Sequence, residues 1–183
     1  MIYGSKCFEE CTVKNGYLVL ALIACTVALA ATARTAESKK PGHRIVGTWK
    51  LVSITAHYPD GRVLADPDLG PSAKGYLVYD GSGHMCAQLM NPNRFDWRNP
   101  NNPTPQEATA GVVGYDAYCG TYEVHESDGI VVHHKELALV PNQVTTSVAR
   151  RFSFVGDRLV LKLMETAHSG ERLGFTLTWE RVN

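Results

Sequence analysis

The sequence lacks the short motifs that mark the common nucleotide-binding and hydrolytic enzymes. It has no phosphate-binding loop, no dinucleotide-binding glycine fingerprint, no Gly-x-Ser-x-Gly nucleophile elbow and no His-Glu-x-x-His zinc motif. It also lacks paired carboxylates on one face of a predicted strand, which glycoside hydrolysis requires. These absences exclude the enzyme classes that depend on such motifs, and we expect no cofactor.

An excess of charge of either sign is also missing. Lys and Arg together number 18, as do Asp and Glu, so the formal net charge of the 183 residues is zero. A chain without a basic surplus has no long-range field that would attract a polyanion. We therefore expect no nucleic-acid partner.

The histidine pattern does not predict a metal site. Among the seven histidines, the closely spaced pair is His133-His134. Neighbouring residues on a strand point to opposite faces of the sheet, so these two side chains cannot easily bind one interior ion. We expect no bound metal.

Long apolar runs are scarce, and the one that stands out is Tyr17–Ala31. Its fifteen residues fall short of the roughly 20 that span a bilayer as a helix. Ala31-Thr32-Ala33 follows with the small-residue pattern of a secretory cleavage site. Residues 1–33 are therefore predicted to be a signal peptide, and the protein is expected to be exported to the periplasm or the exterior.

Two alternatives for this segment remain open. Residues 1–33 could stay attached as an N-terminal membrane anchor, or the protein could be lipidated at Cys25, since Leu22-Ile23-Ala24-Cys25 fits a lipoprotein cleavage pattern. Residues 34–43 are polar and suit a flexible leader. The folded domain is predicted over residues 44–183.

Cysteine is sparse, with five in the whole chain, and removal of the predicted signal peptide leaves Cys86 and Cys119. In an oxidising compartment these two could form a single disulfide. Two separate, buried thiols are the alternative. A single pair does not form the framework of a disulfide-rich fold.

Short strand-like stretches with turn residues between them fill the rest of the chain, and a sustained helical period is lacking. Pro59-Asp60-Gly61 and Asp80-Gly81-Ser82-Gly83 have the composition of tight turns. Eight strands can be counted: the opening strand Trp49–Tyr58, the short strand Arg62–Ala65, a hairpin pair and four strands of a meander. The pattern predicts an all-β, single-domain antiparallel protein, and eight strands are enough to close a small barrel.

One segment interrupts this pattern. Asn91–Pro105 carries four prolines and five asparagines, which predicts a long loop that could serve as a lid, because proline disrupts strand interiors. Thr104 then suits a helix N-cap, with Pro105 in the first turn and Glu107 at the capping-box position. A short helix is predicted from there to about Tyr118.

Strand alternation assigns side chains to the interior. In the last strand one face carries Leu173, Phe175, Leu177 and Trp179, which should point inward. The same rule places Arg150 on an apolar face, between Val148 and Phe152. An unpaired buried charge is costly, so Arg150 needs a partner or must open onto the mouth of the barrel. The alternatives are that Arg150 extends outward from a strand end, or that Arg151 takes the interior position.

Further polar residues are candidates for the cavity wall. One of His133 and His134 should face inward, where a neutral imidazole could bind a ligand or transfer a proton. A tyrosine can line an apolar pocket and still present one hydrogen bond. A purely structural role in packing is the alternative for each residue. The predicted ligand-binding residues are Tyr76, Tyr79, Gln88, Tyr118, Tyr122, His133, His134 and Arg150.

Several sequence blocks between Ile45 and Val182 together resemble the lipocalin-like domain family of the calycin group. They are I-V-G-T-W-K-L-V-S, K-G-Y-L-V-Y-D-G-S-G-H-M, A-Y-C-G-T-Y-E-V, V-V-H-H and R-R-F-S-F-V-G-D-R-L-V-L. The resemblance implies an eight-stranded up-and-down barrel that is open at one end. It also implies that Trp49 plugs the closed end and that Arg181 packs on its ring.

Such a barrel has an interior, and the leading hypothesis is that it binds a small hydrophobic or amphipathic molecule there. One alternative is an isomerase or cyclase that uses the same cavity, with Arg or His as proton handler or charge stabiliser. Another is a structural barrel with a filled interior and no ligand. The sequence does not specify an oligomeric state.

Overall fold

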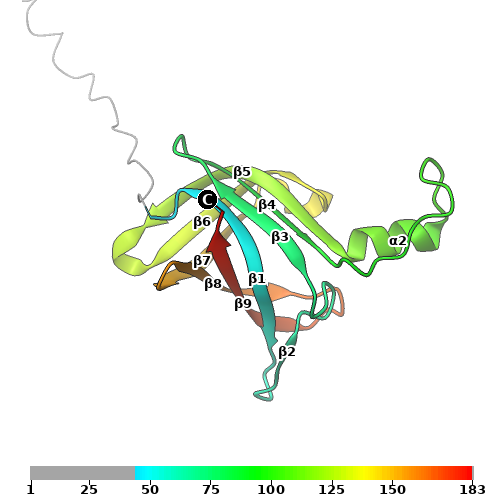
Figure 1. The fold of residues 1–183 in the computed structure, drawn as a ribbon, viewed down its shortest axis with the longest axis horizontal. Helices are drawn as coiled ribbons and strands as arrows, with labels where there is room; N and C mark the ends of the chain where they lie inside the picture. Colours follow the sequence, from blue (N-terminus) through cyan, green and yellow to red (C-terminus); the bar gives the residue numbers. More distant parts are fainter. Residues whose placement is uncertain (1–43, 183) are drawn as a thin grey trace, which may run out of the picture. The chain divides into compact units, whose positions relative to one another are not determined.

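The computed structural model describes residues 44–182, which form an antiparallel β-barrel with one short α-helix (Figure 1). The predicted signal peptide and the leader that follows it lie outside the described residues. Within the described part, no helix is both long enough and apolar enough to cross a membrane.

Neighbouring strands pair antiparallel in a single sheet, and β9 returns to pair with β1, which closes the barrel. Eight strands, β1 and β3 to β9, make up the closed barrel, as predicted. The short β2 pairs with the last three residues of β1 and lies outside the ring. The predicted count is corrected in one respect: five strands, not four, follow the helix. The strands are β1 (Gly47–His57), β2 (Val63–Ala65), β3 (Lys74–Tyr79), β4 (His84–Met90), β5 (Tyr115–His125), β6 (Ile130–Ala138), β7 (Ser147–Val155), β8 (Arg158–Thr166) and β9 (Arg172–Arg181).

The helix α2 (Pro105–Val113) begins as predicted but ends earlier. The Thr104 side chain accepts from the backbone N–H of Glu107, and the Glu107 carboxylate accepts from Thr104, so the capping box is complete. The predicted end at Tyr118 is wrong, because the helix stops before Gly114 and strand pairing with β4 starts at Tyr115. The segment 91–114 projects from the barrel as an arm (Figure 1).

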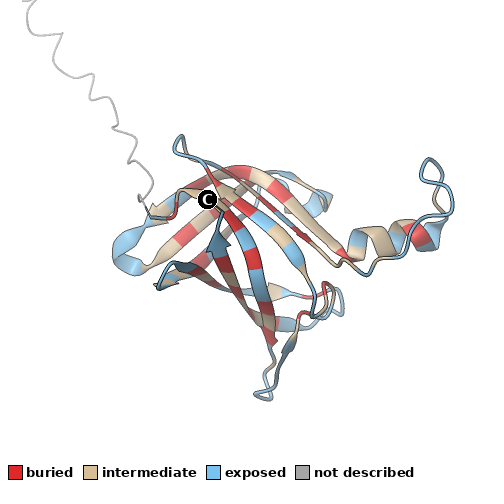
Figure 2. Cartoon of the chain, in the orientation of Figure 1, coloured by how far each residue is buried: buried red, intermediate tan, exposed pale blue. Residues whose placement is uncertain are grey.

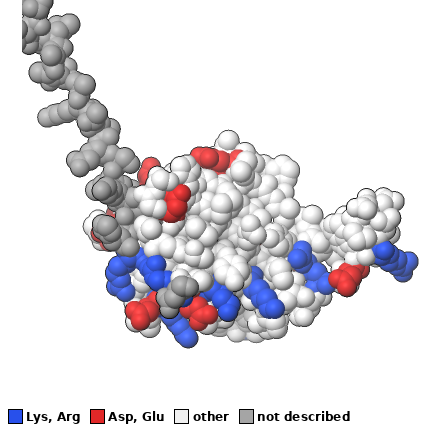
Figure 3. All heavy atoms as spheres, turned by 45° about the horizontal axis from the view of Figure 1, so that its top comes forward, with Lys and Arg blue, Asp and Glu red and all other residues white. Residues whose placement is uncertain are grey.

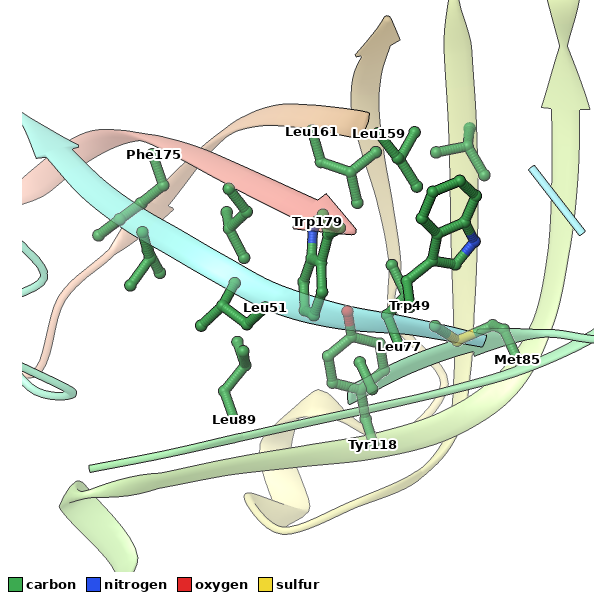
Figure 4. Packing of buried hydrophobic residues seen from close by; sticks show 14 of the residues in the cluster. Trp49, Leu51, Leu77, Met85, Leu89, Tyr118, Leu159, Leu161, Phe175 and Trp179 are labelled. Carbon is green, nitrogen blue, oxygen red and sulfur yellow. The ribbon is translucent and has the colours of Figure 1, made fainter. Parts of the chain in front are cut away.

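Burial alternates along the strands, as Figure 2 shows by colour. The inward prediction for the last strand is confirmed, since its four apolar side chains are buried, as are Leu159 and Leu161 of β8. Figure 4 shows labelled side chains from several strands, among them Leu51, Leu161 and Trp179, directed into the interior. The core therefore occupies the inside of the barrel.

One end of the barrel is closed by Trp49. Its indole N–H donates to the carbonyl of Ile45 at 2.8 Å, and the Arg181 guanidinium lies 4.2 Å from the centre of its ring. Arg181 also donates to the carbonyls of Val46 and Arg44. A Cβ on Gly47, whose φ is +140°, would collide with the Arg181 guanidinium. Glycine is therefore required at position 47 for steric reasons, and Trp49 is required for its packing with Arg181.

Cys86 and Cys119 are joined by a disulfide, which decides between the two alternatives left open by the sequence. They lie directly opposite each other on β4 and β5, with their Cα atoms 4.1 Å apart. Cys86 alternates with the buried Met85 and Ala87, so the disulfide lies on the outer side of the sheet.

Loss of this disulfide should lower the free energy of unfolding by about 2–4 kcal/mol, because the bond restricts the unfolded chain across 33 residues of sequence separation. Urea denaturation of the wild type with and without reductant measures this directly. In a variant carrying both Cys86→Ser and Cys119→Ser, reductant should have no effect. Equal stability of oxidised and reduced wild type would contradict the prediction.

The outer surface carries charges of both signs. On the face seen in Figure 3, Lys and Arg side chains stand among Asp and Glu side chains along the lower border. A few acidic side chains lie toward the upper border, and the broad area between the two borders is uncharged. This mixed pattern agrees with the balanced composition. It gives this face no extended patch of one sign that would recruit a polyanion.

Candidate functional site

A cavity of about 130 Å³ lies in the half of the barrel opposite Trp49. Its walls come from the barrel strands, and its rim comes from the turn after β2, the start of β5, the loop between β6 and β7 and the end of β8. That loop contains a short 3-10 helix, Pro141–Gln143, and Gln143 reaches the cavity. The cavity thus lies at the open end of the barrel. The apolar lining residues include Ile54, Leu77, Leu89, Leu161, Phe175 and Leu177.

Arg150 is a deeply buried cation in the wall of this cavity, with 5% of its surface exposed. It faces inward from the middle of β7, as alternation predicts. Its guanidinium donates to the carbonyl of Val148 at 3.2 Å and lies 3.5 Å from the carboxylate of Glu165 on β8. These two contacts leave several of its five N–H donors for other acceptors. A buried guanidinium with unused donors on a cavity wall is suited to bind an acceptor group.

His133 lines the cavity from β6, the strand paired with that of Arg150, and is completely buried. Its Nε2 atom lies 2.5 Å from the hydroxyl of Tyr79, and its Nδ1 atom lies 3.1 Å from the hydroxyl of Tyr118. Burial lowers the pKa of His133 well below its usual value, and the charges of Arg150 and Lys135 lower it further. The imidazole is therefore neutral and carries one N–H.

The neutral ring decides how the two tyrosines are bonded. Tyr79 is 1% exposed and has no second polar side chain within hydrogen-bond distance among the described residues. The Tyr79 hydroxyl therefore donates its hydrogen to Nε2 of His133. The proton of the neutral ring is then on Nδ1, where it faces the oxygen of Tyr118. The hydroxyl hydrogen of Tyr118 is then free to donate elsewhere. Since Tyr118 lines the cavity, that donor is available to a ligand.

The indole of Trp179 is a buried donor beside the cavity. Trp179 is 1% exposed and lines the cavity, and its Nε1 atom has no hydrogen-bond partner among the described residues. A buried donor without a partner costs roughly 1–3 kcal/mol. Because the Nε1 atom is itself buried, the cavity-lining residues with donors left for a ligand are Arg150 and Tyr118.

Three charged residues nearer the mouth were missed by the sequence reasoning. Lys135 is 3% exposed, donates to Gln143 at 2.9 Å and lies 4.4 Å from the ring centre of Tyr118. Asp116 and Glu165 line the cavity from β5 and β8. Simple alternation would have found Lys135, which follows His133 by two positions, and Glu165, which follows Leu163.

Burial also shifts the pKa values of residues at this site. Burial raises the pKa of Asp116, and the carboxylate of Glu165 raises it further, whereas the charges of Lys135 and Arg150 counter the rise. Burial lowers the pKa of Lys135. Burial raises the pKa of Tyr118 to about 12, with the Arg150 charge opposing the rise, so its phenol stays protonated and remains a donor.

The structure brings together some of the predicted site residues and separates others. Arg150, His133 and Tyr118 line the cavity. Tyr79 supports His133 from behind, and Tyr122 is buried in the core with its hydroxyl donating to the carbonyl of Asp80 at 2.7 Å.

Three further predicted residues lie outside the cavity, in addition to Tyr79 and Tyr122, because each occupies an outward position of its strand. Tyr76 is 54% exposed. Gln88 is exposed and accepts from the hydroxyl of Tyr115, and His134 bonds with Ser147 at 2.7 Å on the outer side. Of the two neighbouring histidines, His133 is therefore the interior one.

His133 makes stability depend on pH in a definite direction. Its pKa is lower in the folded state than in the unfolded chain, so acid favours the unfolded chain below about pH 6.5. We expect His133→Gln to flatten the fall in unfolding free energy between about pH 6.5 and 5, by up to roughly 1.4 kcal/mol per pH unit. Urea denaturation across this range measures the slope. The exposed His84→Gln is the control, and parallel curves for wild type and His133→Gln would contradict the assignment.

Comparison with known proteins adds one finding. The sequence model of the lipocalin-like domain family matches residues 46–182. The matched range covers the whole barrel, from the closed end at Trp49 to the last strand, including every residue of the cavity wall. The chain matches none of the curated proteins with which it was compared.

Proposed function

Because the chain belongs to the lipocalin-like domain family, we propose that it binds one small amphipathic molecule inside the barrel. The apolar part of the ligand contacts the aliphatic and aromatic wall. Its polar group is a hydrogen-bond acceptor, a carboxylate or a carbonyl, and lies against Arg150. Burial of apolar area supplies most of the affinity, and the polar contacts fix the orientation.

The observation that carries this proposal is that the polar groups of the inner wall are hydrogen-bond donors. Arg150 and Tyr118 both present donors there. A donor ligand would leave these two groups unsatisfied, whereas an acceptor pairs with them. The cavity is also not filled by side chains, as the alternative of a barrel without a ligand would require.

The size of the cavity limits the ligand. An apolar cavity of about 150 Å³ in another protein accommodates benzene, and the cavity here has about 130 Å³. One ring of six atoms with a small polar substituent matches this volume. A longer ligand would extend through the mouth, past Asp116 and Glu165.

Native mass spectrometry of the protein, gently purified from its own source, tests the proposal. We expect an added mass of a small molecule with a carboxylate or carbonyl group, lost on denaturation. A protein with no added mass, which also binds no small cyclic carboxylate or ketone in solution, would contradict it.

We further propose that the protein is exported, with cleavage after about Ala33. The disulfide between Cys86 and Cys119 supports this, because such bonds persist in oxidising compartments. The denatured mass of the purified chain tests it. Export with cleavage predicts a chain that begins near Arg34, and a mass that includes residues 1–33 would indicate a retained anchor.

A further inference from the structure

We propose that the barrel is an isomerase for small cyclic ketones, in which Asp116 removes a proton next to the carbonyl while Tyr118 and Arg150 hold the carbonyl oxygen. This inference rests on the proposed function, because it uses the same cavity and the same donors. It adds a chemical step that binding alone does not require.

The first support is the placement of Asp116. It precedes Tyr118 by two residues on β5, and both side chains line the cavity. Two positions along a strand correspond to about 7 Å. Asp116 is thus the next cavity-facing residue of β5 on the mouth side of Tyr118, so a ketone bonded through its oxygen to the Tyr118 hydroxyl can extend toward the Asp116 carboxylate.

The second support is that Asp116 has no structural task in the described part of the chain. No hydrogen bond to its carboxylate occurs among residues 44–182, in contrast to Asp66, which accepts from the backbone of Asp68 and Leu69. Burial raises the pKa of Asp116, which makes its carboxylate a stronger base. Lys135 and Arg150 counter that rise and favour the ionised form that the reaction requires.

The third support is the set of hydrogen-bond donors available to the carbonyl oxygen of the ketone. Proton removal moves negative charge onto the carbonyl oxygen, and donors fixed in a buried site stabilise that charge. Tyr118 is held by His133, which is in turn held by Tyr79, so its hydroxyl is oriented before the ligand arrives. Arg150 adds a positive charge beside it, 5.6 Å from the Tyr118 ring centre.

The reaction balances without a cofactor. The Asp116 carboxylate takes a proton from the carbon next to the carbonyl of a β,γ-unsaturated ketone. The C–H electron pair forms a new C=C bond, and the carbonyl π electrons move onto oxygen, which Tyr118 and Arg150 stabilise. Asp116 then returns the proton to the γ-carbon, which yields the conjugated ketone. Nothing is oxidised or reduced.

Cyclohex-3-enone is a suitable probe because its single ring matches the cavity and its product absorbs in the ultraviolet. We expect the wild type to accelerate conjugation at least 100-fold over buffer, and Asp116→Asn to lose at least 100-fold of that rate. Glu123→Gln alters an exposed carboxylate on the outer face of the same strand and should keep the wild-type rate. The dissociation constant of cyclohexanone, measured by titration calorimetry, should change less than 3-fold in both variants.

The possible results distinguish failure of the isomerase inference from failure of the proposed ligand binding. If cyclohexanone binds but cyclohex-3-enone reacts no faster than in buffer, the isomerase inference fails and the binding proposal stands. If Asp116→Asn binds and reacts like the wild type, Asp116 is not the base. If neither cyclohexanone nor benzoate binds the wild type, the proposed function fails as well.

Discussion

Replacing Trp49 with Ala should lower the free energy of unfolding by about 3–5 kcal/mol, the largest stability effect expected of a single substitution in this chain. Trp49 is 1% exposed. The substitution removes its packing at the closed end, its bond to Ile45 and the surface on which Arg181 lies. It also weakens the site where β9 meets β1. Urea denaturation of the purified domain measures the loss.

Trp97→Ala is the matched control, because Trp97 is 38% exposed on the projecting arm. Its loss should cost less than about 1 kcal/mol, as for most surface substitutions. A cost below 1 kcal/mol for Trp49→Ala would mean that the barrel does not depend on closure at this end.

Replacing Arg150 with Met should weaken the binding of benzoate by about 100-fold or more while leaving the fold intact. Loss of a buried charged partner typically costs about 2–5 kcal/mol in binding. The fold should tolerate the change, because removal of one member of an ion pair is strongly destabilising when the remaining charge stays buried, and much less so when that charge can regain water. Glu165 can do so, since its side chain is 38% exposed. Titration calorimetry gives the affinity, and thermal unfolding gives the stability.

Arg151→Met provides the control within the same strand. Arg151 is the exposed neighbour of Arg150 and faces outward. It should bind benzoate like the wild type. Equal affinity of the two variants would show that the ligand group does not contact Arg150.

The barrel could be predicted from the sequence because its evidence is local and repeated. Turn residues recur between short strands, and a period of two separates the inward from the outward side chains. The same period placed Arg150 inside, because its neighbours Val148 and Phe152 share the face. Which of the two histidines at 133 and 134 faces inward could not be decided, since both neighbours fit the strand.

The site was only partly predictable: strand alternation places Lys135 and Glu165 inside, but the position of Asp116 depends on where the helix ends. Asp116 was missed because the helix was extended through it, although Gly114 ends the helix and β4 pairs with the chain from Tyr115. At Glu136 a bulge in β6 shifts the register against β5, opposite Gly120, and reverses the alternation after Lys135. The cavity itself depends on which side chains leave space, which a pattern of polar and apolar residues does not encode.

The central claim is that an acceptor group lies against Arg150 and Tyr118 inside the barrel. A crystal structure of the protein with 4-bromobenzoate tests it most directly, because the anomalous signal of bromine fixes the orientation of the ligand. We predict the carboxylate within hydrogen-bond distance of Arg150 and the Tyr118 hydroxyl, and the bromine toward the mouth. A bromine position buried against these donors, or a ligand bound only outside the barrel, would contradict the account.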